Sequence, residues 1–507
     1  MPDFGRVLVA NRGEIALRVL RALRTLGIES AITYSDADAT ALPTAFADRA
    51  YRLPGVSAVD TYLNAEAIVE VARQCDADAI HPGYGFLSEN AAFARLCREH
   101  SIGFVGPTSE TLATSGNKIE CKKLAEANGV PVVPYSREAL EDPEEAARFA
   151  SDIGFPVLLK SAFGGGGRGI REATSREEVR DAFSSVRREA ESAFGRAAVF
   201  VEKRLQRPRH IEVQIFGNST GSEVIPLGER ECSIQRRYQK LVEISPSPVV
   251  DEESRARLAD YAATMARAVR YANAGTVEFL RDSATGALYF LEVNARLQVE
   301  HPVTELVTGL DLVAAQFAVA QHGSLPFRPE NVRPRGVAIE CRINSEDPLH
   351  DFLPVTGRIE HLRIPAGPGI RVDTALTEGM EVTPYYDSLL AKAVAWGATF
   401  EEARARELAA LNEFRVVGVP TTIPFHREVM VAPRFIAGDL STAFLDESGI
   451  LPRLAERARE ADPDRFAIAA FLLAQSRAAR TPARSLGSRG RPTLPNAGVG
   501  GRFVDGL

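Results

Sequence analysis

The chain of 507 residues is short of cysteine and of long apolar runs. Its five cysteines are odd in number and no two share a Cys-x-x-Cys spacing, which argues against a disulfide framework and a zinc site. No stretch approaches the roughly 18 apolar residues of a membrane-spanning helix. The first residues, MPDFGRVLVANRGEIA, lack the basic start and cleavage site of a secretory signal. We therefore expect a cytoplasmic protein with no membrane partner.

Lysine is also rare, because only seven of the 60 basic residues are lysines. In a chain that uses arginine almost everywhere, a position that stays lysine indicates a need for a compact ammonium on a flexible stem. One of the seven is Lys160. The net charge of −7 and the lack of Lys/Arg runs argue against a nucleic-acid partner.

The order of apolar segments predicts an α/β fold followed by α+β units. Strand-like and helix-like stretches alternate from RVLVA (6–10) to about residue 106, which is typical of a doubly wound, Rossmann-like parallel sheet. SETLATSGNKIECKKLAEANG (109–129) reads as one helix closed by Gly129. Strand-rich segments follow from 155 to about 320 and from about 335 to 447. The residues beyond, rich in Arg, Pro, Gly and Ser, are expected to be mobile in part.

A run of four glycines lies between a lysine and an arginine in KSAFGGGGRGI (160–170). Bare backbone flanked by cations suits a phosphate chain, because amide N–H groups can approach the anion closely. The run fits neither a P-loop, where the lysine follows the glycines, nor a dinucleotide fingerprint, which opens an apolar helix. Taken alone it is equally typical of a flexible surface loop, so other segments must decide.

The most informative stretch is GTVEFLRDSATGALYFLEVNARLQVEHP (275–302). It predicts two strands joined at DSATG, with Glu278 facing Glu292 across the hairpin. Alternation places Asn294, Arg296 and Gln298 on the face of Glu292 if the strand continues. Two facing carboxylates repel unless a cation separates them, and oxygen ligands suit magnesium bound to nucleotide phosphates. A solvated strand face is the alternative, but the surrounding apolar residues make a naked carboxylate costly.

A guanidinium and a carboxylate follow the predicted metal site. Arg296 suits a planar oxyanion and Glu300 could remove its proton. His301, before Pro302, reads as a structural histidine rather than a base.

Lys118, Lys160 and the glycines opposite Glu278 and Glu292 form a phosphate clamp that resembles the ATP-grasp superfamily. Whole motifs sharpen this resemblance to the biotin carboxylases, the ATP-dependent part of biotin-dependent carboxylases, over about residues 4–447. The motifs are ANRGEIA (10–16), HPGYGFLSEN (81–90), KSAFGGGGRGI (160–170), ERECSIQRRYQK (229–240), EVNARLQVEHPVTE (292–305), ECRINSEDP (340–348) and YYDSLLAK (385–392).

The resemblance implies a division into four segments and a set of nucleotide contacts. The segments are a Rossmann-like domain (1–115), an ATP-grasp domain (116–332) with a mobile glycine-rich lid at about 132–205, a C-terminal strand-rich domain (333–450) and an extension (451–507). The residues implied to bind ATP are Lys118, Lys160, Gly164, Gly165, Gly166, Gly167, Glu202, Lys203, Leu205, His210 and Gln235.

The resemblance also implies the other ligands of the site. Two Mg²⁺ or Mn²⁺ ions would be held by Glu278, Glu292 and Asn294. Bicarbonate would be held by Arg296, Lys240, Gln298 and Val299. Glu300 would be its base, Arg342 would stabilise the biotin enolate, and Tyr84 would lie near the biotin ring.

Three positions depart from the usual family pattern: Phe163 replaces a small residue, Tyr238 a histidine and Asn117 an aspartate. None belongs to the implied metal or base set. The reaction implied is carboxylation of biotin through carboxyphosphate, as the first half-reaction of an acyl-CoA or oxo-acid carboxylase. Its partners would be a biotin carboxyl carrier protein, a carboxyltransferase and a second copy of the chain. Two alternatives stay open, another ATP-grasp ligase and a non-catalytic nucleotide-binding protein.

Overall fold

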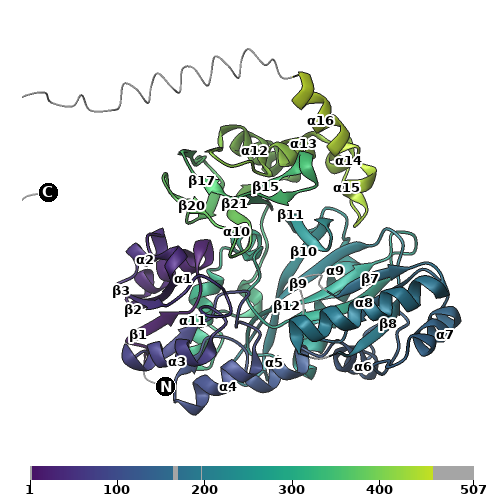
Figure 1. The fold of residues 1–507 in the computed structure, drawn as a ribbon, viewed down its shortest axis with the longest axis horizontal. Helices are drawn as coiled ribbons and strands as arrows, with labels where there is room; N and C mark the ends of the chain where they lie inside the picture. Colours follow the sequence, from purple (N-terminus) through teal and green to yellow (C-terminus); the bar gives the residue numbers. More distant parts are fainter. Residues whose placement is uncertain (1–2, 164–168, 196, 461–507) are drawn as a thin grey trace, which may run out of the picture. The chain divides into compact units, whose positions relative to one another are not determined.

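The computed structural model describes residues 3–163, 169–195 and 197–460. The chain divides into two compact units, residues 1–454 and 455–507. The architecture below is that of the first unit, coloured from purple to yellow-green in Figure 1.

The N-terminal part is a parallel five-stranded sheet of order β3-β2-β1-β4-β5, as the alternating pattern predicts. Helix α1 (Gly13–Leu26) buries apolar residues at helical spacing and ends at Gly27, whose φ of 70° suits a helix C-cap. Val7 and Val9 pack in one core with α1, whereas Leu8 packs on the other face with α3 and α4. The further elements are β1 (Arg6–Val9), β2 (Glu29–Ser35), α2 (Leu42–Phe46), β3 (Arg49–Leu53), α3 (Ala65–Gln74), β4 (Ala79–His81), α4 (Ala91–Glu99) and β5 (Gly103–Phe104).

The single helix predicted for 109–129 is wrong, because the structure has two helices there. Helix α5 (Ser109–Ser115) ends at Gly116, and α6 (Lys118–Ala127) starts anew. The side chain of Asn117 caps α6 by accepting hydrogen bonds from the backbone N–H groups of Ile119 and Glu120. The backbone N–H of Lys118 donates to the carbonyl of Ala162 at 2.9 Å. The break therefore brings Lys118 next to the end of β6.

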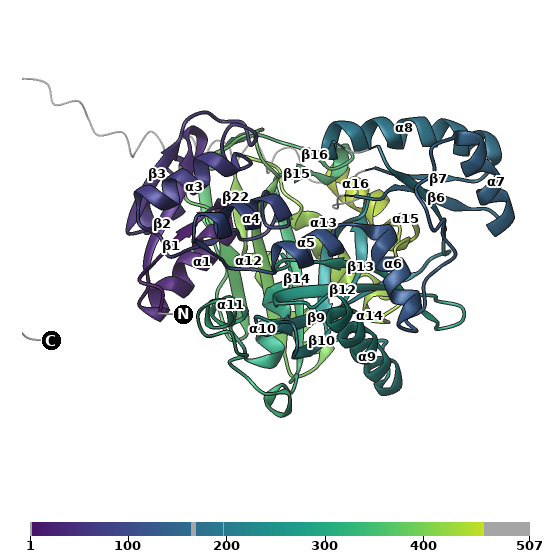
Figure 2. The same ribbon diagram turned by 90° about the horizontal axis from the view of Figure 1, so that it is seen from below.

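A small antiparallel sheet of order β7-β6-β8 lies under two helices, and Figures 1 and 2 show these elements grouped together. Its core is formed by apolar residues of both helices and of all three strands. The elements are α7 (Pro143–Ile153), β6 (Val157–Ser161), β7 (Ile170–Ala173), α8 (Arg176–Phe194) and β8 (Val199–Lys203).

An eight-stranded antiparallel sheet of order β13-β12-β9-β10-β11-β14-β21-β19 forms the centre of the unit. β11 pairs with β14, for example Val242 with Cys341. The sheet thus runs through both strand-rich segments that the sequence separates at about residue 333. The strands are β9 (Arg209–Gly217), β10 (Val224–Arg236), β11 (Gln239–Ser245), β12 (Asn273–Arg281), β13 (Leu288–Asn294), β14 (Val337–Asn344), β19 (Ile370–Thr374) and β21 (Leu389–Gly397).

The first unit also contains further helices and short strand pairs, and its last helix, α16, continues into the second unit. The helices are α9 (Glu252–Ala268), α10 (His301–Thr308), α11 (Leu312–His322), α12 (Phe400–Glu413), α13 (Ile423–Val431), α14 (Pro433–Ile436), α15 (Phe444–Glu447) and α16 (Ile450–Glu460). The short pairs are β15 (Glu346–Asp347) with β16 (Leu353–Pro354), β17 (Gly357–Arg358) with β20 (Glu381–Val382), and β18 (His361–Arg363) with β22 (Arg415–Val417). Short 3₁₀ turns are Asp36–Asp38, Pro329–Asn331 and Pro348–His350.

Among the described residues, no single helix has the length and apolar character to cross a membrane. Helices α10 and α11 meet that test only as a pair, with a 90° bend between them.

Candidate active site

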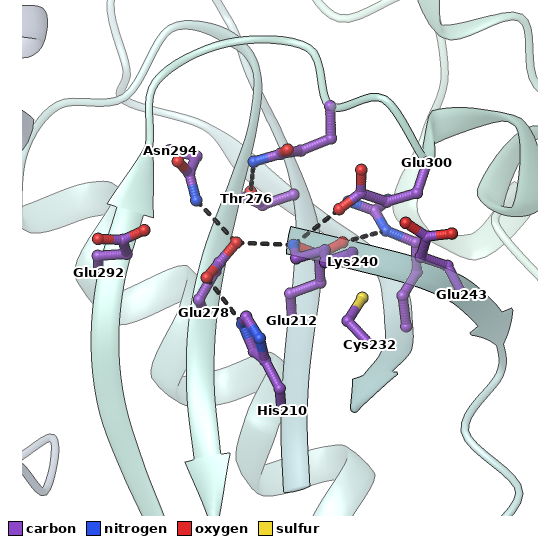
Figure 3. Close-up of polar contacts among 12 residues, drawn as sticks. His210, Glu212, Cys232, Lys240, Glu243, Thr276, Glu278, Glu292, Asn294 and Glu300 are labelled. Atoms are coloured by element: carbon purple, nitrogen blue, oxygen red, sulfur yellow. Dashed lines mark hydrogen bonds and ion pairs between the residues drawn. The ribbon is translucent and has the colours of Figure 1, made fainter. Parts of the chain in front are cut away.

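The hairpin of β12 and β13 places two glutamates opposite each other, as its alternation predicts. Glu278 pairs with Glu292 in the strand register, and the amide nitrogen of Asn294 donates to Glu278 at 2.8 Å. Figure 3 shows these three side chains side by side on the hairpin. Two carboxylates and an amide form the all-oxygen donor set that a hard divalent cation takes.

Alternation would place Arg296 and Gln298 on this face only if the strand continued, and that condition is not met, because β13 ends at Asn294. The backbone N–H of Ala295 donates to the Glu89 carboxylate instead of to a strand partner. The same carboxylate binds Arg296 at 2.9 Å. Arg296 also donates to Gln298 at 3.0 Å, and Gln298 donates to Thr276 of β12 at 3.0 Å. A loop rather than a strand thus brings Arg296 and Gln298 together beside the hairpin.

Lys240 of β11 lies at the centre of the candidate site. Its ammonium contacts Glu212 at 2.7 Å, Glu278 at 2.9 Å and Glu300 at 2.7 Å. Figure 3 shows its nitrogen between Glu278 and Glu300. Burial alone would lower the pKa of Lys240, but the three glutamates raise it well above its ordinary value. Lys240 therefore stays charged, and its ammonium bridges Glu278, the predicted metal ligand, and Glu300, the predicted base.

Glu300 is fully buried at the start of α10 and has two cationic partners. Arg342 of β14 donates to it at 2.9 Å and to Glu243 at 2.6 Å. Burial would raise the pKa of Glu300, but Lys240 and then Arg342 hold it well below its ordinary range. Burial raises the pKa of Glu243 to about 7, although Arg342 lowers it. The next residue, His301, is buried with its Nδ1 2.8 Å from the Gln298 carbonyl, which agrees with a structural role.

Glu212, Glu243 and Arg230 belong to the cluster and were missed by the sequence analysis. Arg230 is fully buried and donates to Glu212 at 2.5 Å. Glu212 lies opposite Glu278 in the β9–β12 register. The signal was present in RHIEVQIFG, where His210, Glu212 and Gln214 alternate with apolar residues and so share one face.

Glu212, Cys232 and Glu300 also offer ligand atoms within 4.8 Å of one another. The cations Arg230 and Lys240 already pair with these two carboxylates. Glu278 and Glu292 also have partners, but Lys118 and His210 among them are predicted phosphate-binding residues, which a bound nucleotide would draw away from the carboxylates. The hairpin therefore fits a divalent cation better than the buried cluster does.

Two of the predicted nucleotide-binding residues contact this hairpin, and a third lies on the small sheet. Lys118 binds Glu292, Lys160 of β6 binds Glu202 of β8, and His210 Nε2 lies 2.7 Å from Glu278. Gln235 contacts the other ring nitrogen of His210 at 3.4 Å. The structure thus brings Lys118 and His210 to the two metal-type carboxylates, and Lys160 is linked to them through Glu202, whose charge also acts on Lys118.

Other predicted site residues either make different contacts or lie outside the residues that the structure describes. The ammonium of Lys203 binds the carbonyls of Gly154 and Phe155, at 2.9 and 2.8 Å, and not a site carboxylate. Leu205 is partly buried just after β8. The predicted lid glycines Gly164, Gly165, Gly166 and Gly167 lie outside the described residues.

Tyr84 and Val299 meet through a lysine that the sequence analysis did not select. Lys392 of β21 donates to the Val299 carbonyl at 3.1 Å and contacts Glu14 at 3.0 Å. The hydroxyl of Tyr84 donates to the same Glu14 carboxylate. One buried ammonium therefore connects the two predicted substrate positions.

Three family models match the chain in sequence order. They are "Biotin carboxylase, N-terminal domain" over residues 3–112, "Carbamoyl-phosphate synthase L chain, ATP binding domain" over 117–328, and "Biotin carboxylase C-terminal domain" over 340–447.

Two relatives match over most of both chains. Biotin carboxylase 1 of Bacillus subtilis is 46% identical over 446 residues, which are 88% of this chain and 99% of the relative. The biotin carboxylase of a Nostoc species is 47% identical over 444 residues, or 88% and 99% of the two chains.

Solved structures show the same fold. The biotin carboxylase domain dimer of Hydrogenobacter thermophilus 2-oxoglutarate carboxylase, in complex with MgADP, ADP and bicarbonate, is 47% identical with a TM-score of 0.86, covering 89% of this chain and 99% of that one. A biotin carboxylase complex from Campylobacter jejuni is 42% identical with a TM-score of 0.85, covering 88% and 99%. Fold and relatives together define an ATP-dependent carboxylase. The chain belongs to the biotin carboxylase family.

Proposed function

We propose that this chain carboxylates the biotin of a separate carrier protein, using ATP and bicarbonate, as the first half-reaction of a carboxylase. The observation that carries the proposal is the contact of Lys240 with both Glu278 and Glu300, while Arg342 holds Glu300 from the other side. Phosphate-activating and proton-transferring groups are thereby held in one buried cluster.

Mg²⁺ or Mn²⁺ fits Glu278, Glu292 and Asn294. When bound, the metal supplies neutralising charge to the ATP phosphates and aligns them for transfer. Lys118, Lys160 and His210 would bind the same phosphates, with Gln235 supporting the histidine. Glu202, the backbone at Lys203 and Leu205 would lie on the base side. Because Lys118, Lys160 and His210 each already contact a carboxylate, ATP binding exchanges these contacts.

Most of the residues that would bind and activate bicarbonate lie on the loop after β13. Arg296, Lys240, Gln298 and the Val299 backbone would hold the anion, and Glu300 would take its proton. A carboxylate with a depressed pKa is a weak base. The contacts of Lys240 and Arg342 with Glu300 must therefore weaken as these two cations contact the substrate. The deprotonated oxygen attacks the γ-phosphorus, releasing ADP and forming carboxyphosphate.

Biotin carboxylation completes the reaction. Carboxyphosphate breaks down to carbon dioxide and phosphate, and the phosphate takes the ureido proton of biotin. Arg342 stabilises the enolate that captures carbon dioxide, with Tyr84 near the biotin ring. The predicted lid glycines 164–167 would exclude water, to which carboxyphosphate is labile.

The assembly is part of the same proposal. A carrier protein and a carboxyltransferase would complete the enzyme, and the chain would act as a homodimer. The final acceptor belongs to the carboxyltransferase, since relatives named for pyruvate and for 2-oxoglutarate are about equally similar, at 48% and 47% identity. The cytoplasmic location and the four-segment division stay predictions.

The test is ATP cleavage measured with and without bicarbonate and free biotin. We expect cleavage to require bicarbonate. Glu300→Gln should reduce this activity by about 100- to 10,000-fold, as for loss of a general base. Arg342→Ala should reduce carboxybiotin formation more than ATP cleavage, because the enolate forms later.

Glu120→Gln, an exposed carboxylate on α6, serves as the control for these two variants. Cleavage that ignores bicarbonate would favour another ATP-grasp ligase. Nucleotide binding without turnover would favour a non-catalytic role.

A further inference from the structure

Lys392 is a buried lysine that the reaction described above does not use. Its side chain is fully buried on β21. It contacts the Val299 carbonyl at 3.1 Å, Glu14 of α1 at 3.0 Å and Asp373 of β19 at 3.7 Å. These partners come from three segments that are far apart in the sequence. A single ammonium therefore ties the loop after β13 to the N-terminal helix and to the central sheet.

Further ion pairs hold this junction in place. Arg371 grips Asp373 with two bonds, at 2.9 and 2.7 Å, and binds Glu305 of α10 at 2.7 Å. Arg18 of α1 binds Glu305 at 2.9 Å. The network thus spans α1, α10, β19 and β21, and the ammonium has little freedom to move.

Glu14 links Lys392 to Tyr84. One of its oxygens accepts from the Tyr84 hydroxyl and pairs with Lys392. Its other oxygen is buried and has no hydrogen-bond partner among the residues the structure describes. Lys392 also lies 5.8 Å from the centre of the Tyr84 ring. The orientation of Tyr84 therefore depends on Glu14, and that of Glu14 on Lys392.

Stability alone does not explain such a network. Buried ion pairs are often no more stabilising than apolar side chains of similar volume, whereas they fix the direction of the groups that they touch. Here the fixed groups are the Val299 carbonyl, beside the predicted bicarbonate site, and the Tyr84 hydroxyl, beside the predicted biotin site. Small misplacements of such groups have large kinetic effects.

We propose that Lys392 is a positioning residue for biotin carboxylation: it holds the bicarbonate loop at Val299 and, through Glu14, the ring of Tyr84. This inference rests on the proposed function. It assigns to Lys392 an effect on the use of bicarbonate and biotin, and none on the binding of MgATP.

The test compares Lys392→Met with the wild type. We expect kcat/KM for bicarbonate and for free biotin to fall by about 10- to 100-fold. The Kd for MgATP, measured without bicarbonate, should stay within about twofold. Lys123→Met, at a surface lysine paired with Glu120 and Glu138, is the matched control and should change neither quantity.

A double-mutant cycle with Tyr84→Phe separates positioning from general stability. If Lys392 acts on biotin through Glu14, removing the Tyr84 hydroxyl should cost far less in the Lys392→Met background than in the wild type. Additive losses would overturn the proposal, as would unchanged kinetics or a loss confined to MgATP binding.

If Lys392→Met fails to bind MgATP because it is misfolded, Glu14→Gln replaces it in the same cycle, since it nearly conserves volume. Non-additivity with Tyr84→Phe is again expected, and additivity overturns the inference. A wild-type chain without bicarbonate-dependent ATP cleavage would instead show that the proposed function itself is wrong.

Discussion

Buried charge is the dominant feature of the site at the scale of single residues. Lys118, Lys160 and Lys240 each contact a glutamate. Such pairing keeps a buried ion from being left alone, which would cost several kcal/mol. Burial would raise the pKa of Glu202, but Lys122 and then Lys160 lower it to about 2. Each ion pair keeps its two charges in place until a ligand binds. A nucleotide or bicarbonate would then contact the lysines, and a metal would contact the glutamates.

Glu407 gives a residue-scale prediction away from the site. It is fully buried on α12, and burial raises its pKa from 4.5 to about 8 despite a contribution from Cys341 that lowers it. Between these values the folded state binds more protons than the unfolded state, so stability falls as pH rises. The loss is about 5 kcal/mol at most, from about 1.4 kcal/mol per pH unit. Glu407→Gln should therefore remove much of the decline in urea midpoint between pH 6 and pH 9.

The control for this prediction lies at the start of the same helix. Glu401 is exposed and pairs with Arg404, which lowers its pKa. Glu401→Gln should shift the midpoint by the same amount at both pH values. A pH dependence that is unchanged in Glu407→Gln would show that this carboxyl titrates normally.

At the scale of elements, the break between α5 and α6 decides where Lys118 lies. The cap formed by Asn117 accepts from two backbone N–H groups, at 3.2 and 3.3 Å. Asn117→Ala should lower the free energy of unfolding by about 1 kcal/mol, the usual cost of a lost helix N-cap. It should also weaken MgATP binding, because Lys118 is the first residue of α6.

Urea denaturation and nucleotide titration measure the two effects of this substitution. Asn117→Asp, which keeps the cap and suits the helix dipole, should retain both stability and binding. An alanine variant as stable as the parent would mean that the cap contributes nothing.

Sequence patterns predicted those elements whose signal is local. Alternation in GTVEFL and LYFLEVN was enough to place Glu278 opposite Glu292, because a hairpin register depends on neighbouring residues. The same reasoning could not fix where β13 ends, since the backbone N–H of Ala295 finds its partner in the distant Glu89. Glu243 and Lys392 were missed because their partners, Arg342 and Glu14, lie on elements remote in sequence, and only the tertiary fold brings such charges together.

For the whole molecule, the eight-stranded sheet explains how the site is held. β9, β11, β12 and β14 carry His210, Glu212, Lys240, Glu278 and Arg342 on one continuous hydrogen-bonded surface. A site built on paired strands keeps its side chains within narrow limits. The family motifs predicted which residues gather here, and the pairing of β11 with β14 shows why residues from two strand-rich segments do so.

The last prediction concerns the division of labour between this chain and a carrier. Biotin is attached to a lysine in a motif such as Ala-Met-Lys-Met, which the family resemblance places on the carrier. None of the four methionines here adjoins a lysine, and no lysine follows residue 447. The purified chain should therefore show no avidin binding and no biotin adduct by mass spectrometry.

The chain should carboxylate free biotin slowly and a biotinylated carrier domain much faster, because docking raises the local concentration of biotin. A carrier domain with its biotinyl lysine replaced by arginine is the control and should accept no carboxyl group. Covalent biotin on this chain, or acyl-CoA carboxylation by it alone, would contradict the assignment.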